Sequence, residues 1–125
     1  MRQLRRRSTT ARRARERLES TAERFDTIGD VRGRGLMLGV EFVDRAADWR
    51  GPGPHAPSGD LAESVQAECF DRGLIIELGG RKSATARFLP PLIVSAGQTD
   101  EIATIFEEAV TSIHEGRTRT REVST

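Results

Sequence analysis

The feature that most constrains the fold is a set of four apolar segments that are too short to be buried helices. They are residues 35–43, 74–76, 86–89 and 92–94. Short, largely apolar runs of this kind, the first of them partly β-branched, are typical of strands. We therefore expect extended segments here, the first entered through a turn at Gly33–Arg34–Gly35 and the last held open by Pro90 and Pro91.

Three longer segments instead carry apolar residues every three or four positions, as one face of a helix does. The segments and their apolar stripes are 10–25 (Ala11, Ala14, Leu18, Ala22, Phe25), 60–72 (Leu61, Val65, Cys69) and 96–113 (Ile102, Phe106, Ala109, Val110, Ile113). Asp60 with Glu63, and Ser95 with Gln98, have the spacing of a capping box at a helix start. Gly73 follows the second helix and favours its termination.

The order of these elements predicts an α+β domain with a small antiparallel or mixed sheet and helices on one face. Seven of the nine residues from Gly51 to Gly59 are Gly, Pro or Ser, so we expect a flexible loop over 48–59. The expected organisation is a basic N-terminal helix over residues 1–26, a domain over 27–114 and a disordered polar tail over 115–125.

Composition sets broad limits on the size and location of the protein. The 125 residues suffice for one domain, but only 36% are hydrophobic and none is Tyr, so the core is either lean or completed by another chain. The single cysteine, Cys69, fits a reducing compartment. We find no apolar run of membrane-spanning length and no apolar secretory signal, and the sequence predicts a cytoplasmic protein without a membrane segment.

The charge is unevenly distributed along the chain. Residues 1–17 carry eight Arg and one Glu, whereas the remainder has a net charge of −6. Such a basic helix is able to neutralise nucleic-acid phosphates. However, it has no interleaved aromatic residue to stack on bases, and its Arg residues lie all around the helix. We favour a solvated basic helix face and keep nucleic-acid binding as an alternative.

The sequence contains no common cofactor-binding or metal-binding motif. Gly33, Gly35 and Gly39 are spaced one residue away from a dinucleotide fingerprint, and a strand rather than a helix follows them, so they favour a tight turn and close strand packing. His55, Cys69 and His114 are scattered, and no metal site is predicted. We also find no nucleophile–base arrangement and therefore predict no catalytic residue.

Two stretches resemble the C-terminal segment of class-III pyridoxal-phosphate aminotransferases. One runs from Cys69-Phe-Asp-Arg-Gly-Leu-Ile-Ile-Glu77 through Gly79-Gly80-Arg81 to Ala86-Arg87-Phe-Leu-Pro-Pro-Leu-Ile-Val94. The other is Val31-Arg-Gly-Arg-Gly-Leu-Met-Leu-Gly-Val-Glu-Phe42. Together the resemblance covers about residues 10–114 and is strongest to diaminobutyrate–2-oxoglutarate aminotransferases. It implies the C-terminal small domain of fold-type-I enzymes, preceded by the end of the inter-domain helix.

The resemblance also implies a substrate-binding residue. In relatives, the arginine before the Phe-x-Pro-Pro-Leu segment pairs with a substrate carboxylate, and that position is Arg87. A guanidinium offers a planar fork that grips both carboxylate oxygens. Gly79, Gly80 and Arg81 are expected to shape the same entrance. The alternative is an Arg87 that is simply paired with a local Glu on the strand surface.

The parent enzyme implied by the resemblance uses pyridoxal 5′-phosphate, which the family holds in a large domain that precedes the matched region. The sole lysine, Lys82, matches no Schiff-base position of the family. We therefore expect this chain to bind no cofactor alone, and to need a large domain or an intact aminotransferase subunit as partner, in a family that is homodimeric or larger. A self-standing nucleic-acid-binding module and a non-catalytic remnant that packs on an intact aminotransferase remain alternatives.

Overall fold

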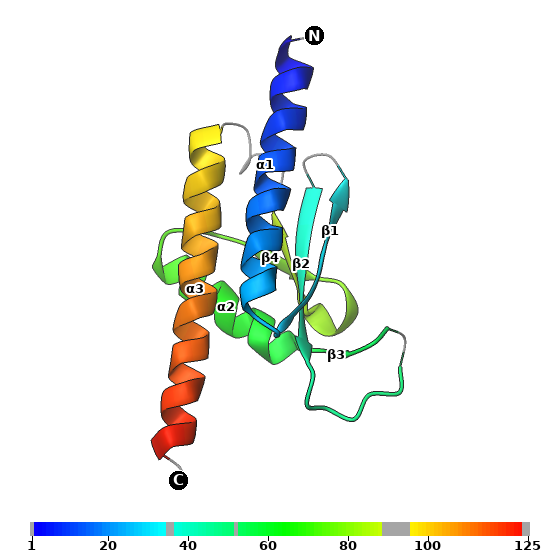
Figure 1. The fold of residues 1–125 in the computed structure, drawn as a ribbon, viewed down its shortest axis with the longest axis vertical. Helices are drawn as coiled ribbons and strands as arrows, with labels where there is room; N and C mark the ends of the chain where they lie inside the picture. Colours follow the sequence, from blue (N-terminus) through cyan, green and yellow to red (C-terminus); the bar gives the residue numbers. More distant parts are fainter. Residues whose placement is uncertain (1, 35–36, 52, 89–95, 124–125) are drawn as a thin grey trace.

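The computed structural model describes residues 2–34, 37–51, 53–88 and 96–123, in which helices cover one face of an antiparallel sheet (Figure 1). The α+β class predicted from the sequence is confirmed. The elements are α1 (Arg2–Arg24), β1 (Ile28–Arg34), β2 (Met37–Asp44), β3 (Ala56–Pro57), α2 (Gly59–Asp71), β4 (Glu77–Gly79), the 3₁₀ turn η1 (Arg81–Ser83), β5 (Thr85–Phe88) and α3 (Ala96–Val123).

The sheet has the order β1-β2-β5-β4, and all of these pairs are antiparallel. The two central strands pair from Leu38 opposite Phe88 to Glu41 opposite Thr85. The short strand β3 pairs with the end of β2, where Val43 lies opposite Pro57. Strands β2 and β5 are far apart in sequence, so the sheet depends on a long-range pairing.

The hydrophobic core lies between the helices and one face of the sheet. Because side chains alternate along a strand, Leu38, Val40 and Phe42 of β2 share this face and are at most 4% exposed. All three helices contribute to the same cluster, including Leu18 from α1, Val65 from α2 and Phe106 from α3. Most members of the predicted stripes are thus confirmed as core positions, while Ala22, Ile102 and Ile113 are partly buried and pack against the core; the side chain of Ala11 lies outside those described.

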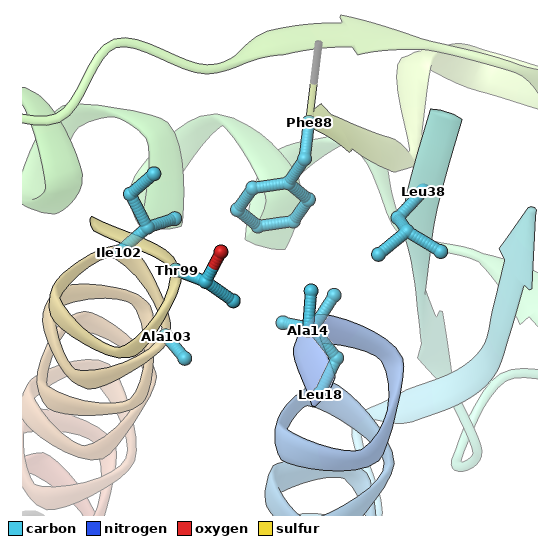
Figure 2. Close-up of a pocket in the computed structure, with 7 residues that line it drawn as sticks. All are labelled: Ala14, Leu18, Leu38, Phe88, Thr99, Ile102 and Ala103. Carbon is cyan, nitrogen blue, oxygen red and sulfur yellow. The ribbon is translucent and has the colours of Figure 1, made fainter. Parts of the chain in front are cut away.

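Helices α1 and α3 run side by side, so the first and the last helix of the chain pack together (Figure 1). Arg13 forms two hydrogen bonds with the Asp100 carboxylate, at 2.8 and 2.7 Å, and Arg24 forms an ion pair with Glu107. Where these helices meet β2 and β5, a small apolar cavity of about 10 Å³ remains. Figure 2 shows its lining residues converging from both helices and both strands, among them Leu18, Leu38 and Phe88. The cavity has room for about one water molecule, so this interface is nearly filled.

Several predicted boundaries were wrong. We did not expect strand β1; Gly33 and Arg34, placed in a turn by the sequence, belong to it, and Arg34 pairs with Met37. The strand expected at 74–76 begins only at Glu77. Ser58, rather than Asp60, caps α2, since its hydroxyl accepts a hydrogen bond from the Leu61 backbone N–H. The predicted helix end is confirmed, because Gly73 has the left-handed φ of +88° typical of this position.

The two expected irregular segments are more ordered than the sequence suggested. Part of the 48–59 loop is regular, because β3 pairs with β2 and α2 begins at Gly59. Helix α3 continues to Val123, although we expected a disordered tail from Glu115. Between Glu115 and Val123 the tail contains no Pro, and a single Gly116 does not stop a helix. The segment expected at 92–94 and the cap at Ser95 lie outside the described residues.

A search of the described helices for a membrane-spanning segment found none that is both long and apolar enough.

Candidate functional site

The face of the sheet opposite the helices is polar and consists of two rows that cross the strands. Residues directly opposite each other in an antiparallel pair share a face, so the register defines each row. The first row is Arg32, Gly39, Arg87 and Glu77, from β1 to β4. The second row is Asp30, Glu41, Thr85 and Gly79. We call this surface the polar face.

Arg87 lies on the polar face and is exposed to solvent. Its side chain leans across β4 and rests on Gly79: a Cβ atom built on Gly79 would lie 2.5 Å from Nε and 2.6 Å from Nη2 of Arg87. Glu77 is directly opposite Arg87 in the β4–β5 pair. Nevertheless, no carboxylate among the described residues forms an ion pair with the Arg87 guanidinium. The structure therefore gives no support to the alternative of a local Glu partner.

The residues that join β4 to β5 form a strained turn beside Arg87. Gly80 has a φ of +73°, and Lys82 and Ser83 have φ values of +53° and +55°, which non-glycine residues rarely adopt. Thr85 closes over Gly80, where a Cβ atom would lie 2.6 Å from the Thr85 hydroxyl oxygen. The side chains of Arg87 and Thr85 from β5 thus pack closely on the backbone of Gly79 and Gly80.

Arg81 extends from this turn toward a buried carboxylate, Glu41, that sequence reasoning missed. The Glu41 side chain is only 6% exposed, and its Oε2 atom lies 2.9 Å from Arg32 Nη2 and 3.8 Å from Arg81 Nη2. Oε2 accepts no well-aligned hydrogen bond, so the attraction is mainly between charges. A hydrogen bond to Asp30 and the charge of Glu41 raise the pKa of Arg32. A hollow of about 230 Å³ lies beside this cluster.

One signal in the sequence points to Glu41. It is the only charged residue in the apolar segment 35–43, and a charge inside a strand-forming run needs a partner once it is buried. The identity of that partner depends on the pairing of β1 with β2, which the sequence did not predict.

The remaining candidate groups do not assemble a catalytic site. The Lys82 ammonium lies 5.0 Å from the centre of the Trp49 ring, within the range of a cation–π interaction. Burial raises the pKa of the Cys69 thiol to about 12, which leaves it protonated and unreactive at neutral pH. Among the described residues, no group of three His, Cys, Asp or Glu side chains is placed to hold a metal ion.

The basic helix uses several of its arginines inside the fold. Arg13 and Arg17 form ion pairs with Asp100, at 2.7 and 3.5 Å, and Arg15 forms one with Glu19 at 2.9 Å. Such pairs reduce the positive charge that α1 offers to an external phosphate. This favours the structural interpretation of the helix over nucleic-acid binding.

The comparison with known families decides the membership of the chain. The sequence model of the family described as aminotransferase class-III matches residues 2–110. The chain belongs to the class-III aminotransferases. A diaminobutyrate–2-oxoglutarate aminotransferase from Rhizobium meliloti (strain 1021) is 44% identical over 94 residues, which are 74% of this chain and 20% of that protein. An alanine/serine racemase from Pyrococcus horikoshii is 31% identical over 108 residues, which are 86% of this chain and 21% of that protein.

Solved structures agree with this membership. A phospholyase from Arthrobacter, in complex with phosphoethanolamine, is 25% identical and superimposes with a TM-score of 0.73 over 86% of this chain and 24% of its own. A lysine aminotransferase from M. tuberculosis, also 25% identical, gives a TM-score of 0.68 over 86% of this class-III chain and 21% of its own. The chain spans about a fifth of the length of the curated relatives that it matches.

The described residues do not fit pyridoxal phosphate, the cofactor that the resemblance implied for the parent enzyme. A cofactor aldehyde needs a lysine amine, and the ammonium of the sole lysine, Lys82, lies against Trp49. The polar face mixes Arg32, Arg81 and Arg87 with carboxylates and has no helix N-terminus among its two rows, whereas a phosphate cradle commonly uses one. The group that this class-III domain presents to a ligand is the Arg87 guanidinium on the polar face.

Proposed function

We propose that this chain is the C-terminal part of an aminotransferase that moves an amino group between a diamino acid, such as 2,4-diaminobutyrate, and 2-oxoglutarate. Several relatives that are 31–44% identical carry the name of this activity. Relatives named as a racemase and a phospholyase belong to the same set of matches, so the reaction rests on the similarity to the diaminobutyrate enzymes rather than on the fold.

In this proposal Arg87 binds a substrate carboxylate. The observation that carries it is the exposed Arg87 guanidinium, which lies over Gly79 and has no ion-pair partner among the carboxylates that the structure describes. A guanidinium that is already extended and not paired loses little conformational entropy when it binds a carboxylate through two hydrogen bonds. Gly79, Gly80 and Arg81 border the same part of the polar face, and we assign them to the rim of the substrate entrance.

The polar face is also the surface on which we place the rest of the enzyme. A preceding large domain, or an intact subunit, supplies pyridoxal phosphate and its lysine, and the parent enzyme is a homodimer or larger assembly in the cytoplasm. The 125-residue chain alone is then inactive and binds no cofactor. Its own contribution to the reaction is to bind the acid group of the substrate at Arg87 and to orient it.

Reconstitution with a cofactor domain tests this function. The chain is co-expressed with the Rhizobium meliloti relative lacking its matching C-terminal segment, and glutamate formation from 2,4-diaminobutyrate and 2-oxoglutarate is measured. We expect activity from the pair and none from either part. Arg87→Gln should raise the KM for 2-oxoglutarate by about 10- to 100-fold, because charged hydrogen bonds are lost.

The control is Arg72→Gln, which removes an arginine that pairs with Glu68 on α2, and it should leave the KM unchanged. An unchanged KM in Arg87→Gln would remove the assigned role of this residue. Glutamate production by the chain on its own would overturn the proposal that a separate domain provides the cofactor.

A second candidate function is that of a non-catalytic chain that packs on an intact aminotransferase. It is favoured by Phe70 and Ile75, which are 66% and 68% exposed and both line a hollow of about 340 Å³ beside α2. Exposed apolar patches of this kind mark interaction surfaces. Co-purification of the tagged chain with a full-length relative, lost in Phe70→Ser but kept in Glu19→Ser, would support it.

A further inference from the structure

We propose that Gly79 is a positioning residue for Arg87. Because Gly79 has no side chain, the guanidinium packs directly on its backbone, and this contact, the Gly79 platform, fixes the direction of the guanidinium. The inference rests on the proposed function, in which Arg87 binds the acid group of the substrate. It adds a second residue that acts on the ligand only through Arg87.

The contact between the two residues is steric and close. A Cβ atom on Gly79 would collide with Cζ, Nε and Nη2 of Arg87, and the distances to the two nitrogens would be only 2.5 and 2.6 Å. These three atoms lie in the plane of the guanidinium, and all three are near the Cβ position. The guanidinium therefore lies face-on over Gly79 rather than touching it with one edge.

The backbone at Gly79 does not itself require glycine. Gly79 is not among the glycines with positive φ, which in the described chain are Gly33, Gly53, Gly73 and Gly80. It is the last residue of strand β4 and pairs with Thr85. An alanine could thus adopt the same backbone conformation, and the three heavy atoms nearest to the added methyl group all belong to the Arg87 guanidinium.

This platform determines how a carboxylate can reach Arg87. All N–H groups of a guanidinium point outward in its plane. With one face covered by the backbone of β4, the fork of N–H groups points along the sheet surface. A bidentate carboxylate must then approach edge-on, nearly parallel to the polar face. The same lean toward Gly79 explains why Glu77, opposite Arg87 in the register, is not its partner.

Gly80 provides a matched control on the neighbouring residue. A Cβ atom there would meet Thr85 rather than Arg87, and the φ of +73° disfavours any side chain. Gly80→Ala should therefore cost more stability than Gly79→Ala, through backbone strain and the contact with Thr85. If both glycines had only a structural role, Gly79→Ala and Gly80→Ala would differ from each other in stability but not in the order of the Arg87 side chain.

The first experiment follows the Arg87 side chain by NMR in the 125-residue chain. The heteronuclear NOE of the Arg87 Nε–Hε group reports its order on the ps–ns timescale. We expect an ordered group in the wild type and in Gly80→Ala, and a mobile or shifted one in Gly79→Ala. An Arg87 signal that is equally mobile in the wild type and in Gly79→Ala would overturn the inference, whatever the chain binds.

The second experiment titrates the chain with glutarate, an unreactive five-carbon diacid, and follows the same signal. We expect Gly79→Ala to weaken glutarate binding about tenfold or more, since small displacements of a binding group are costly. Gly73→Ala, at a positive-φ glycine that follows α2 and is not part of the polar face, should change it less than about threefold. If Arg87→Gln abolishes binding and Gly79→Ala does not alter it, the role of Gly79 is refuted while that of Arg87 stands. If Arg87→Gln binds glutarate like the wild type, the proposed role of Arg87 fails instead.

A double-mutant cycle covers the case in which Gly79→Ala unfolds the chain. Because the atoms closest to the added methyl group all belong to Arg87, the combined Gly79→Ala, Arg87→Ala variant should recover most of the stability lost in Gly79→Ala. A combined variant that is as unstable as the single one would show that Gly79 is needed for another reason, and the inference would be wrong.

Discussion

Replacing Phe106 by alanine should remove a large part of the stability of this domain. Phe106 is fully buried, and its ring lies 5.2 Å from that of Phe88 and 6.1 Å from that of Phe42, measured between centroids. The three phenylalanines come from α3, β5 and β2, so the substitution leaves a cavity where helix and sheet meet. Buried Phe→Ala changes cost about 3–5 kcal/mol, whereas a domain of this size is stable by only about 5–15 kcal/mol.

The assay is urea unfolding followed by circular dichroism, together with a thermal scan. At about 4 °C per kcal/mol, the variant should melt roughly 12–20 °C below the wild type. Phe70→Ala is the matched control, because the same ring is removed from a side chain that is 66% exposed. Its cost should be about 0.5 kcal/mol or less. Equal costs for the two variants would refute the assignment of the core to the space between α3 and the sheet.

Three further predictions concern single groups. Cys69, with a pKa of about 12, should react with a thiol reagent at pH 8 only when the chain unfolds, so fast labelling of the native chain would contradict its burial. The hydrogen bond from Arg13 lowers the pKa of Asp100, so its stabilising effect is present above the ordinary Asp pKa of about 3.9 and is lost as the pH falls through the lowered value. Asp100→Asn should therefore melt earlier than the wild type at pH 6, and this difference should shrink as the pH is lowered below about 3.9. Glu41→Ala leaves Arg32 and Arg81 without their shared carboxylate and should cost about 1–3 kcal/mol in urea unfolding, while a neutral result would show that the ion pair contributes little.

The periodic parts of the sequence predicted the fold well. Leu61, Val65 and Cys69 were placed on one helical face, and all three are buried in α2. The same holds for Phe106, Ala109 and Val110 of α3. These positions are predictable because a helix that packs on a sheet must bury one stripe, and the spacing of that stripe is fixed by the geometry of the helix.

The prediction failed where pairing rather than periodicity determines the structure. Strand β1 contains Gly29, Asp30 and Gly33, residues that are rare in strands. It forms because β2 offers an unpaired edge directly after it, which is a tertiary effect. Conversely, Leu74 and Ile76 are buried without belonging to a strand, since an apolar residue can fill the core from an irregular segment.

The candidate site, like the fold, was predicted from the sequence only in part. The position of Arg87 before Phe88 and the two prolines is a local signal, and the resemblance identified it from the sequence. The location of its guanidinium over Gly79 depends on the register of β4 against β5. The Arg32–Glu41 pair likewise requires β1 to lie beside β2. Contacts between strands of this kind cannot be derived from composition or spacing alone.

The packing of α3 against α1 and α2 has a consequence for the synthesis of the chain. Phe106 of α3 belongs to the same core cluster as Phe42 of β2, with 6.1 Å between the two ring centroids, and it leaves the ribosome long after Phe42. At 5–20 residues per second, this contact can form only roughly 3 to 13 seconds after Phe42 has been synthesised. A two-stranded hairpin of β1 and β2 is at most marginally stable by itself during this time. The core between helices and sheet is therefore complete only after α3 has been made, and until then apolar side chains such as Phe42 are incompletely covered and favour aggregation.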